Sequence, residues 1–223
     1  MKPVRRIFSK NNNFFQLMER AANFCILNIL ALFCCFPIVT AGAGIVAAHT
    51  VMQKLLTECE VPVTQTFFRT FKEKFKHATL LWLLALVATV LLVLDIGLIY
   101  ANFRSTLAVV MYVVLGIISL IALGTIAFAF PLISRYDNTF REHLGNAFYL
   151  ATHQLPRTVA MVVIYLSPVL IFLCSAFAFH LTIPLWVFLG ISSIIMLQTR
   201  LTDPIFKKLE QDEDTVENKD VTP

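Results

Sequence analysis

Three stretches of this chain carry no Asp, Glu, Lys or Arg, and the longest reads TVAMVVIYLSPVLIFLCSAFAFHLTIPLWVFLGISSIIMLQT, residues 158–199. The other two are residues 21–53 and 105–134. About 20 apolar residues span the hydrocarbon of a bilayer, so each stretch is long enough to cross it at least once. The sequence therefore predicts an all-α, polytopic transmembrane helix bundle.

The composition agrees with this prediction. Of the 223 residues 58% are hydrophobic, the mean hydropathy is +0.76, and only 14% are charged, against about 25% in an average soluble domain. The net charge of +4 comes from basic residues divided among short segments beside the apolar runs. That pattern orients a membrane protein and does not indicate nucleic-acid binding.

No motif in the sequence points to catalysis. The apolar runs contain no Ser/His/Asp, Cys/His or paired-carboxylate arrangement, and the five cysteines form no CxxC pair and no Cys/His ligand spacing. We interpret the cysteines as small packed residues of a helix bundle. We therefore expect no catalytic residue, no metal and no cofactor, and a protein that is not an enzyme.

Beyond the first run, four spans are clear. They are predicted at residues 78–102, 106–133, 158–179 and 184–199. The third apolar segment is expected to end at Pro131, Pro168 should kink the next span, and Pro184 can open the last one. Together with the first run, the chain has five or six membrane segments.

The first run is too long for one span. A straight helix over residues 21–53 would measure about 50 Å, against about 30 Å of hydrocarbon. A break at Pro37, followed by Thr40 and two glycines, would let the chain return. Two alternatives stay open, a single crossing or entry and return, and we favour return because both flanks are basic. Asn28 and His49 flank the break and can bind the freed backbone.

The Lys and Arg residues indicate which segments share a side of the membrane. Segments 54–77, 135–157 and the chain from Arg200 onward contain five, three and four Lys or Arg residues, whereas Arg104 stands alone between the second and third spans. Short loops rich in Lys and Arg stay in the cytoplasm. We therefore expect these three segments and the C-terminus to be cytoplasmic, in a multi-pass protein of the plasma membrane.

Two short amphipathic helices are predicted on the cytoplasmic side. The first covers residues 64–77, sets four phenylalanines against basic residues, and is expected to continue into the second span. The second covers residues 140–154, with Thr139 as its cap and Glu142 at the third helical position. A short helix between spans resembles the element by which permeases contact a transport ATPase. The alternative is an interfacial helix that packs on its own bundle.

Several motifs resemble those of the YesL family of bacterial membrane proteins. They are FPIVT with the following Gly42, FKEKFK at 71–76, FPLISRYDNT at 130–139, Asn146-Ala147, and Leu155-Pro156-Arg157-Thr158. The resemblance covers residues 14–210 and is most specific over 130–158. The family has no known activity, and its genes often stand beside carbohydrate ABC uptake systems and polysaccharide-degrading enzymes. The resemblance therefore implies a role accessory to carbohydrate uptake or sensing.

Two groups of polar residues are the candidate sites. We interpret Arg135, Asp137, Asn138 and Thr139 as a polar cap where a span meets a cytoplasmic helix. Asp95 is the only acid inside an apolar segment, and such a group is a functional-site hypothesis by default. Because Asp95 lies late in its span, we favour an interfacial pair with Arg104. A proton or solute site is the alternative.

We divide the chain into a basic interfacial segment (1–20), a transmembrane domain (21–200) and an acidic tail (201–223) that should be disordered from Gln211. The leading hypothesis is an accessory or regulatory protein of ABC-type carbohydrate uptake, with the lipid bilayer and sugar ABC-transporter components as partners. The rival is a permease-like subunit or a small-solute transporter. A continuous polar cavity around Asn28, His49 and Asp95 would favour the rival.

Overall fold

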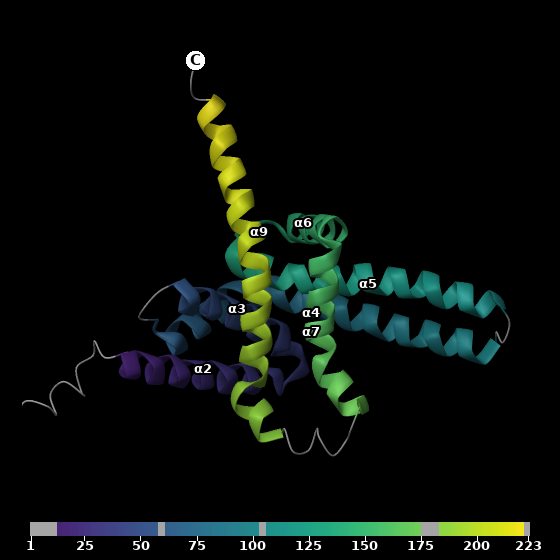
Figure 1. The fold of residues 1–223 in the computed structure, drawn as a ribbon, viewed down its shortest axis with the longest axis horizontal. Helices are drawn as coiled ribbons and strands as arrows, with labels where there is room; N and C mark the ends of the chain where they lie inside the picture. The colour runs from purple at the N-terminus through teal and green to yellow at the C-terminus, as the bar shows by residue number, and fades with distance from the viewer. Residues whose placement is uncertain (1–12, 58–60, 103–105, 175–182, 221–223) are drawn as a thin grey trace, which may run out of the picture.

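The computed structural model describes residues 13–57, 61–102, 106–174 and 183–220, and every element within these ranges is helical. The elements are α2 (Asn13–Cys35), the 3-10 turn η1 (Ile38–Thr40), α3 (Ala41–Thr57), α4 (Val63–Asn102), α5 (Thr106–Arg135), α6 (Phe140–His153), α7 (Leu155–Cys174), the π-helical turn η2 (Trp186–Gly190) and α9 (Ile191–Asp220). The predicted all-α helix bundle is confirmed (Figure 1).

The first apolar run breaks at Pro37. α2 ends at Cys35, and α3 begins at Ala41 after η1. The Thr40 hydroxyl donates to the carbonyl oxygen of Cys34 at 2.7 Å and to that of Pro37 at 3.0 Å, so it takes up carbonyls that the break sets free. Each leg is long and apolar enough to cross a membrane. The predicted break is confirmed, and the return of the chain to the cytoplasmic side stays a prediction.

The contact between α3 and α4 is very close. A Cβ placed on Gly42 would lie 2.5 Å from the Cβ of Trp82 and 2.6 Å from the carbonyl oxygen of Ala78. The indole Nε1 of Trp82 donates to the carbonyl oxygen of Ile38 at 2.7 Å. Only glycine leaves room for the two helices at this distance, which explains a glycine just after the break.

α4 and α5 form a long pair whose far half extends beyond the other helices (Figure 1). The predicted amphipathic helix at 64–77 continues without a break into the second span, as expected. Pro131 does not end α5, contrary to the prediction, because the helix runs on to Arg135. Hydroxyls satisfy carbonyls in its last turns: Ser134 donates to Pro131 at 2.7 Å, and Thr50 donates to Ser134 at 3.1 Å.

The remaining helices cross this group. α6 is short and is followed directly by α7, and α7 and α9 run across α3, α4 and α5 (Figure 1). Of the turn predicted at residues 180–184, residues 180–182 lie outside the described residues, and residues 183 and 184 are helical. α9 is helical as far as Asp220, which differs from the disordered tail predicted from Gln211. Adding residues to an existing helix avoids the cost of nucleation, so polar residues can continue α9. The domain boundaries at 20 and 200 stay predictions.

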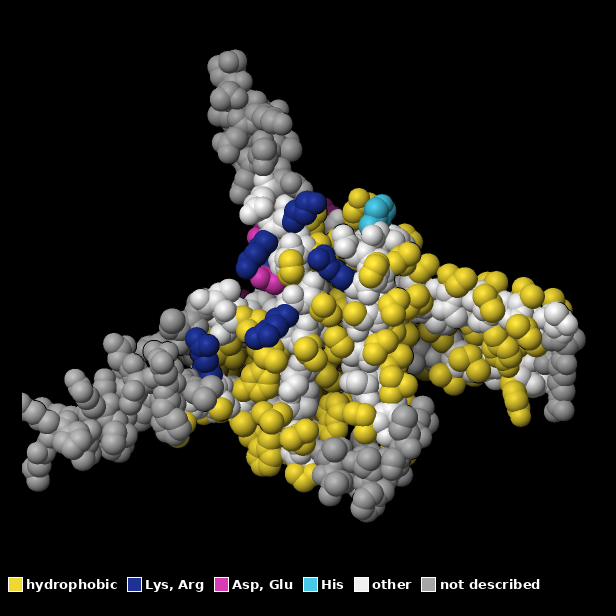
Figure 2. All heavy atoms as spheres, in the orientation of Figure 1, with side chains coloured by type: hydrophobic (Ala, Val, Ile, Leu, Met, Phe, Trp, Pro, Cys, Tyr) yellow, Lys and Arg dark blue, Asp and Glu magenta, His cyan; other side chains and the backbone are white. Residues whose placement is uncertain are grey.

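Two buried clusters hold the helices together. One contains Phe128, Phe130 and Phe206 with parts of α6 and α7, and the other joins Leu27 of α2 to Met52 of α3. Outside these clusters, apolar side chains cover much of the surface (Figure 2). Six helices are long and apolar enough to cross a membrane, so the prediction of five or six membrane segments is confirmed.

Candidate functional site

Arg135, the last residue of α5, is the centre of a network of ion pairs. Its Nε and Nη2 atoms donate to the two carboxylate oxygens of Glu210, each at 2.9 Å, and its Nη1 atom donates to Asp203 at 2.9 Å. The guanidinium also lies 5.5 Å from the centre of the Phe206 ring. A fork of parallel hydrogen bonds is the strongest geometry available to an arginine and a carboxylate. This network fixes the end of α5 to α9.

The two residues after Arg135 extend this network to α4. The Tyr136 hydroxyl donates to Glu210 at 2.8 Å, and Lys74 of α4 donates to the Tyr136 carbonyl at 3.0 Å. Lys74 also pairs with Asp137 and holds the pKa of that carboxyl below its usual value. The segments 54–77, 135–157 and the chain after Arg200 therefore meet on one side of the bundle. We call these contacts the Arg135 cluster.

α6 begins with the predicted capping box. The backbone N–H of Thr139 donates to the Glu142 carboxylate at 2.9 Å, and the Thr139 side chain accepts from the third helical residue. The first of these bonds lowers the pKa of Glu142.

His143, one residue later, is buried, and desolvation is the main reason that its pKa is lowered, with Lys74 and His77 adding to the effect.

Replacing Thr139 with alanine should lower the free energy of unfolding by about 0.5–2 kcal/mol, the usual cost of a lost cap. Thr139→Ser keeps the hydroxyl and should be nearly neutral. Thermal unfolding of the two variants in the same detergent is the measurement. A serine variant as unstable as the alanine variant would rule out capping and indicate that the threonine methyl or a ligand matters.

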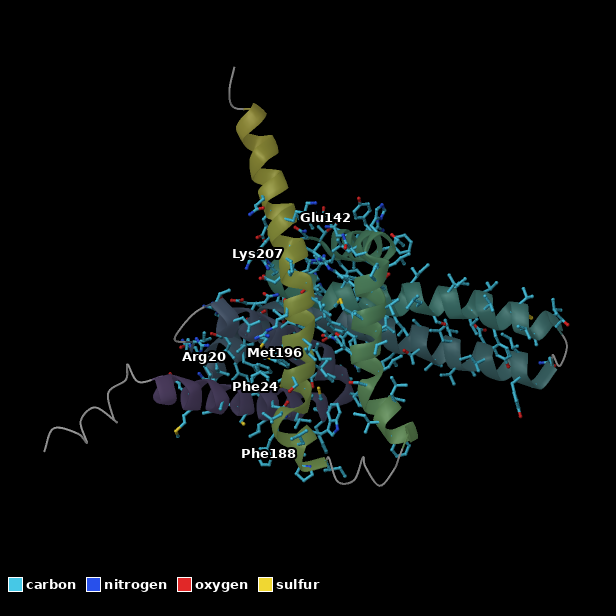
Figure 3. The ribbon with its side chains drawn as sticks, viewed as in Figure 1. Arg20, Phe24, Glu142, Phe188, Met196 and Lys207 are labelled. Carbon is cyan, nitrogen blue, oxygen red and sulfur yellow. The ribbon has the colours of Figure 1, made fainter. Side chains whose placement is uncertain are left out.

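A hollow of about 490 Å³ lies next to the Arg135 cluster, between the ends of α3 and α5 and the middle of α9. We call it the basic hollow. It is lined by Gln53, Lys54, Leu56, Thr57, Arg135, Thr199, Arg200, Asp203, Pro204 and Lys207. Figure 2 shows basic side chains gathered over this part of α9, and Figure 3 shows Lys207 on the half of α9 nearest Glu142 and α6. Basic groups thus collect where the apolar helices end.

Deeper in the bundle lies a group of buried polar side chains from three helices. His49 of α3 and Gln198 of α9 are completely buried, and Gln198 is the polar neighbour of both His49 and Tyr165 of α7. Among the described residues, no hydrogen bond of normal geometry reaches either His49 ring nitrogen, the Gln198 amide or the Tyr165 hydroxyl. Buried polar atoms without partners are costly, so such a group is a candidate for a functional role.

Asn28 has a different role from the one predicted. Its amide nitrogen donates to the carbonyl oxygens of Trp186 at 3.2 Å and Val187 at 2.6 Å, and its amide oxygen accepts from the Ser192 N–H at 2.9 Å. Asn28 therefore binds the irregular backbone of η2 and not the break at Pro37. At that break the Thr40 hydroxyl binds the free carbonyls. The π-helical turn leaves backbone groups out of register, which explains why they need a side-chain partner.

The other predicted positions are spread over the structure. Asp95 is exposed and borders an apolar groove between α4 and α5, and Arg104 lies outside the described residues, so the predicted pair with Asp95 stays a prediction. Asp95 shares no lined cavity with Asn28 and His49 among the described residues. The remaining positions have ordinary surroundings: Asn138 is half-buried, Asn146 and Pro156 are exposed, and Arg157 bonds Gln154 at 3.4 Å.

Sequence reasoning missed the partners of Arg135. Asp203 and Glu210 belong to the predicted acidic tail, although a spacing of seven residues places them on one helix face. It also missed Gln198 and Tyr165, because one polar residue in an apolar run carries no signal of what it meets. The charged residues of α9 alone could have suggested a role for Asp203 and Glu210. No local pattern could have suggested that Gln198 and Tyr165 are neighbours.

The fold and these sites define the class, which is a multi-pass, all-α membrane protein with no group of metal-ligating side chains in the part of the chain that the structure describes. Residues 24–96 match the family described as "Protein of unknown function, DUF624". The chain is also 29% identical over 152 residues, 68% of either chain, to the "Uncharacterized protein YesL" of Bacillus subtilis (strain 168). The chain is YesL-like, and the predicted resemblance is confirmed. No solved structure matches it.

Proposed function

We propose that this chain is a non-enzymatic accessory protein of the plasma membrane that works beside an ABC-type carbohydrate uptake system. The YesL-like character supports the association, since the resemblance implies a role near such systems. The structural observation that carries the proposal is the outward face of α6, which would touch the permease or its ATPase on the cytoplasmic side.

The two faces of α6 differ in what covers them. Ala147, Leu150 and Ala151 are buried against the bundle, whereas Phe148 and Tyr149 are 54% and 55% exposed. Exposed apolar side chains within the spans face lipid, but α6 lies between two spans and is held by the Arg135 cluster at its start. Aromatic residues are enriched where proteins bind one another. An aromatic pair on a fixed, short helix is therefore a suitable contact for a partner.

Capture from membranes tests this contact. The tagged full-length chain should co-purify with a sugar permease or its ATPase, and Phe148→Ala with Tyr149→Ala should reduce that capture by roughly tenfold or more, as expected for aromatic hot spots. The control is Phe33→Ala with Phe36→Ala, an even more exposed aromatic pair on the first apolar run, at 78% and 91%. Equal capture by all three proteins would contradict the contact, and capture of neither partner would contradict the proposal.

The orientation of the protein in the membrane is a separate prediction. In a chain whose five cysteines have been replaced, Asn138→Cys should stay unreactive toward an impermeant thiol reagent in intact cells, because its segment is basic and should be cytoplasmic. Asn102→Cys, at the far end of α4, should react. Labelling at 138 in intact cells would place the Arg135 cluster outside and exclude contact with an ATPase.

The rival function is transport of a small polar solute, and the buried polar group supports it. His49, Gln198 and Tyr165 present polar atoms without partners in the middle of the bundle, which is where a solute would need them. The test is uptake of labelled sugars by proteoliposomes that contain the full chain. Transport that is lost in Gln198→Leu and kept in Gln211→Leu would make the protein a transporter and displace the accessory role.

A further inference from the structure

We infer that the basic hollow binds a phosphate group, either the headgroup of an anionic phospholipid or a free phosphate. The first reason is where its cations stand in the sequence. The charge-free runs 21–53, 105–134 and 158–199 are followed immediately by Lys54, Arg135 and Arg200. All three of these residues line the same hollow.

This convergence sets the depth of the hollow. Each of the three cations is the first charge after a stretch of apolar helix, so each marks the level at which hydrocarbon gives way to headgroups. The fold brings the three boundaries together at the ends of α3 and α5 and on α9. A basic pocket between membrane helices at this level is the usual site for an anionic headgroup.

The charges in the hollow are not balanced. Its four cations are Lys54, Arg135, Arg200 and Lys207, and the acids that face them are Asp203 and Glu210, which leaves a surplus of two positive charges. Asp203 and Glu210 hold Arg135, and Asp203 also holds Lys207 at 2.7 Å. In the described part of the chain, Lys54 and Arg200 have no ion-pair partner. They are the two cations available to a ligand.

The surroundings suit a phosphate group joined to an apolar tail. The residues that line the hollow are both polar, as are Gln53, Thr57 and Thr199, and apolar, as are Leu56 and Pro204. Arg135 is held in place by its bidentate bond to Glu210. It would therefore contribute a fixed positive charge to the wall of the hollow and would not move toward a ligand. A volume of about 490 Å³ accommodates a headgroup.

The experiment measures binding of phosphatidylglycerol, phosphatidylcholine and inorganic phosphate to the full chain in neutral detergent, by native mass spectrometry and by thermal stabilisation. The site variant is Lys54→Gln with Arg200→Gln. The control is Lys72→Gln with Lys208→Gln, which removes the same charge from exposed residues outside the hollow. At about fivefold per cation near an anionic headgroup, the site variant should weaken phosphatidylglycerol binding by about 30-fold.

The control variant should change this binding by less than about threefold, because exposed charges are screened. Stabilisation by phosphatidylglycerol alone, lost in the site variant, would identify a lipid headgroup as the ligand. Equal stabilisation by inorganic phosphate, also lost in the site variant, would identify a soluble phosphate. Binding that both variants weaken equally, or that the site variant leaves unchanged, would overturn the inference.

Discussion

Replacing Gly42 with alanine should destabilise the protein strongly. The same replacement at a glycine of α4 or α5 with open space around it should cost far less. The new Cβ would lie 2.5 Å from the Cβ of Trp82 and 2.6 Å from the carbonyl oxygen of Ala78, and neither atom can move without shifting α4. Overpacking of this kind costs about 1–3 kcal/mol. We expect a loss near the upper end, measured as the free energy of unfolding in detergent.

Gly116→Ala is the matched control. A Cβ on Gly116 of α5 meets no atom within 4 Å, and alanine is the better helix former by up to about 1 kcal/mol. Gly116→Ala should therefore leave stability unchanged or raise it. If the two alanine variants behaved alike, the close contact between α3 and α4 would not be a real feature of the folded protein.

Removal of Arg135 should have the second large effect. In Arg135→Met the carboxylates of Asp203 and Glu210 lose their shared partner, and hydrogen bonds to charged groups are worth about 1.5–3 kcal/mol each. Because the three side chains are between 21% and 39% exposed, solvent reduces this loss, and we expect roughly 2 kcal/mol in total. At the size of this chain the unfolding temperature should fall by about 4–8 °C.

Two further variants isolate the cause. Arg141→Met removes an exposed arginine of α6 and should change stability by no more than about 0.5 kcal/mol. Glu210→Gln in the Arg135→Met background should cost much less than Glu210→Gln alone, because residues in one network are not additive. Additive losses would show that Arg135 and Glu210 do not act on each other.

The sequence predicted the parts of this fold that depend on local chemistry. The absence of charge over residues 158–199 is a direct consequence of lipid burial, and Pro37, followed by Thr40 and two glycines, ends α2 as its local sequence predicts. Thr139 and Glu142 form a capping box because both partners lie within one turn. The prediction that Pro131 ends the span was wrong: a proline inside a helix removes only the hydrogen bond to the residue four positions earlier, and α5 continues to Arg135.

The contacts between distant segments could not be predicted in this way. Arg135 and Glu210 are 75 residues apart, and only the packing of α5 against α9 makes them partners. Gln198 has polar neighbours on α3 and α7 for the same reason. Asn28 was expected to bind the backbone freed at Pro37, but it binds a π-helical turn that no sequence pattern indicated.

The unbroken length of α4 gives the protein a mechanical property. At 1.5 Å per residue its 40 residues form a rod of about 60 Å, and from Val63 to Ile96 it contains neither glycine nor proline at which to bend. Lys74 connects one end of this rod to Asp137 and Tyr136, whereas the other end lies far beyond the bundle. From Trp82, where α4 meets Gly42, to Asn102 is about 30 Å, so a partner that tilted the helix by about 10° at this contact would sweep the far end through roughly 5 Å of lipid, with α5 carried along. The contact between α4 and Gly42 of α3 is the point about which α4 would pivot.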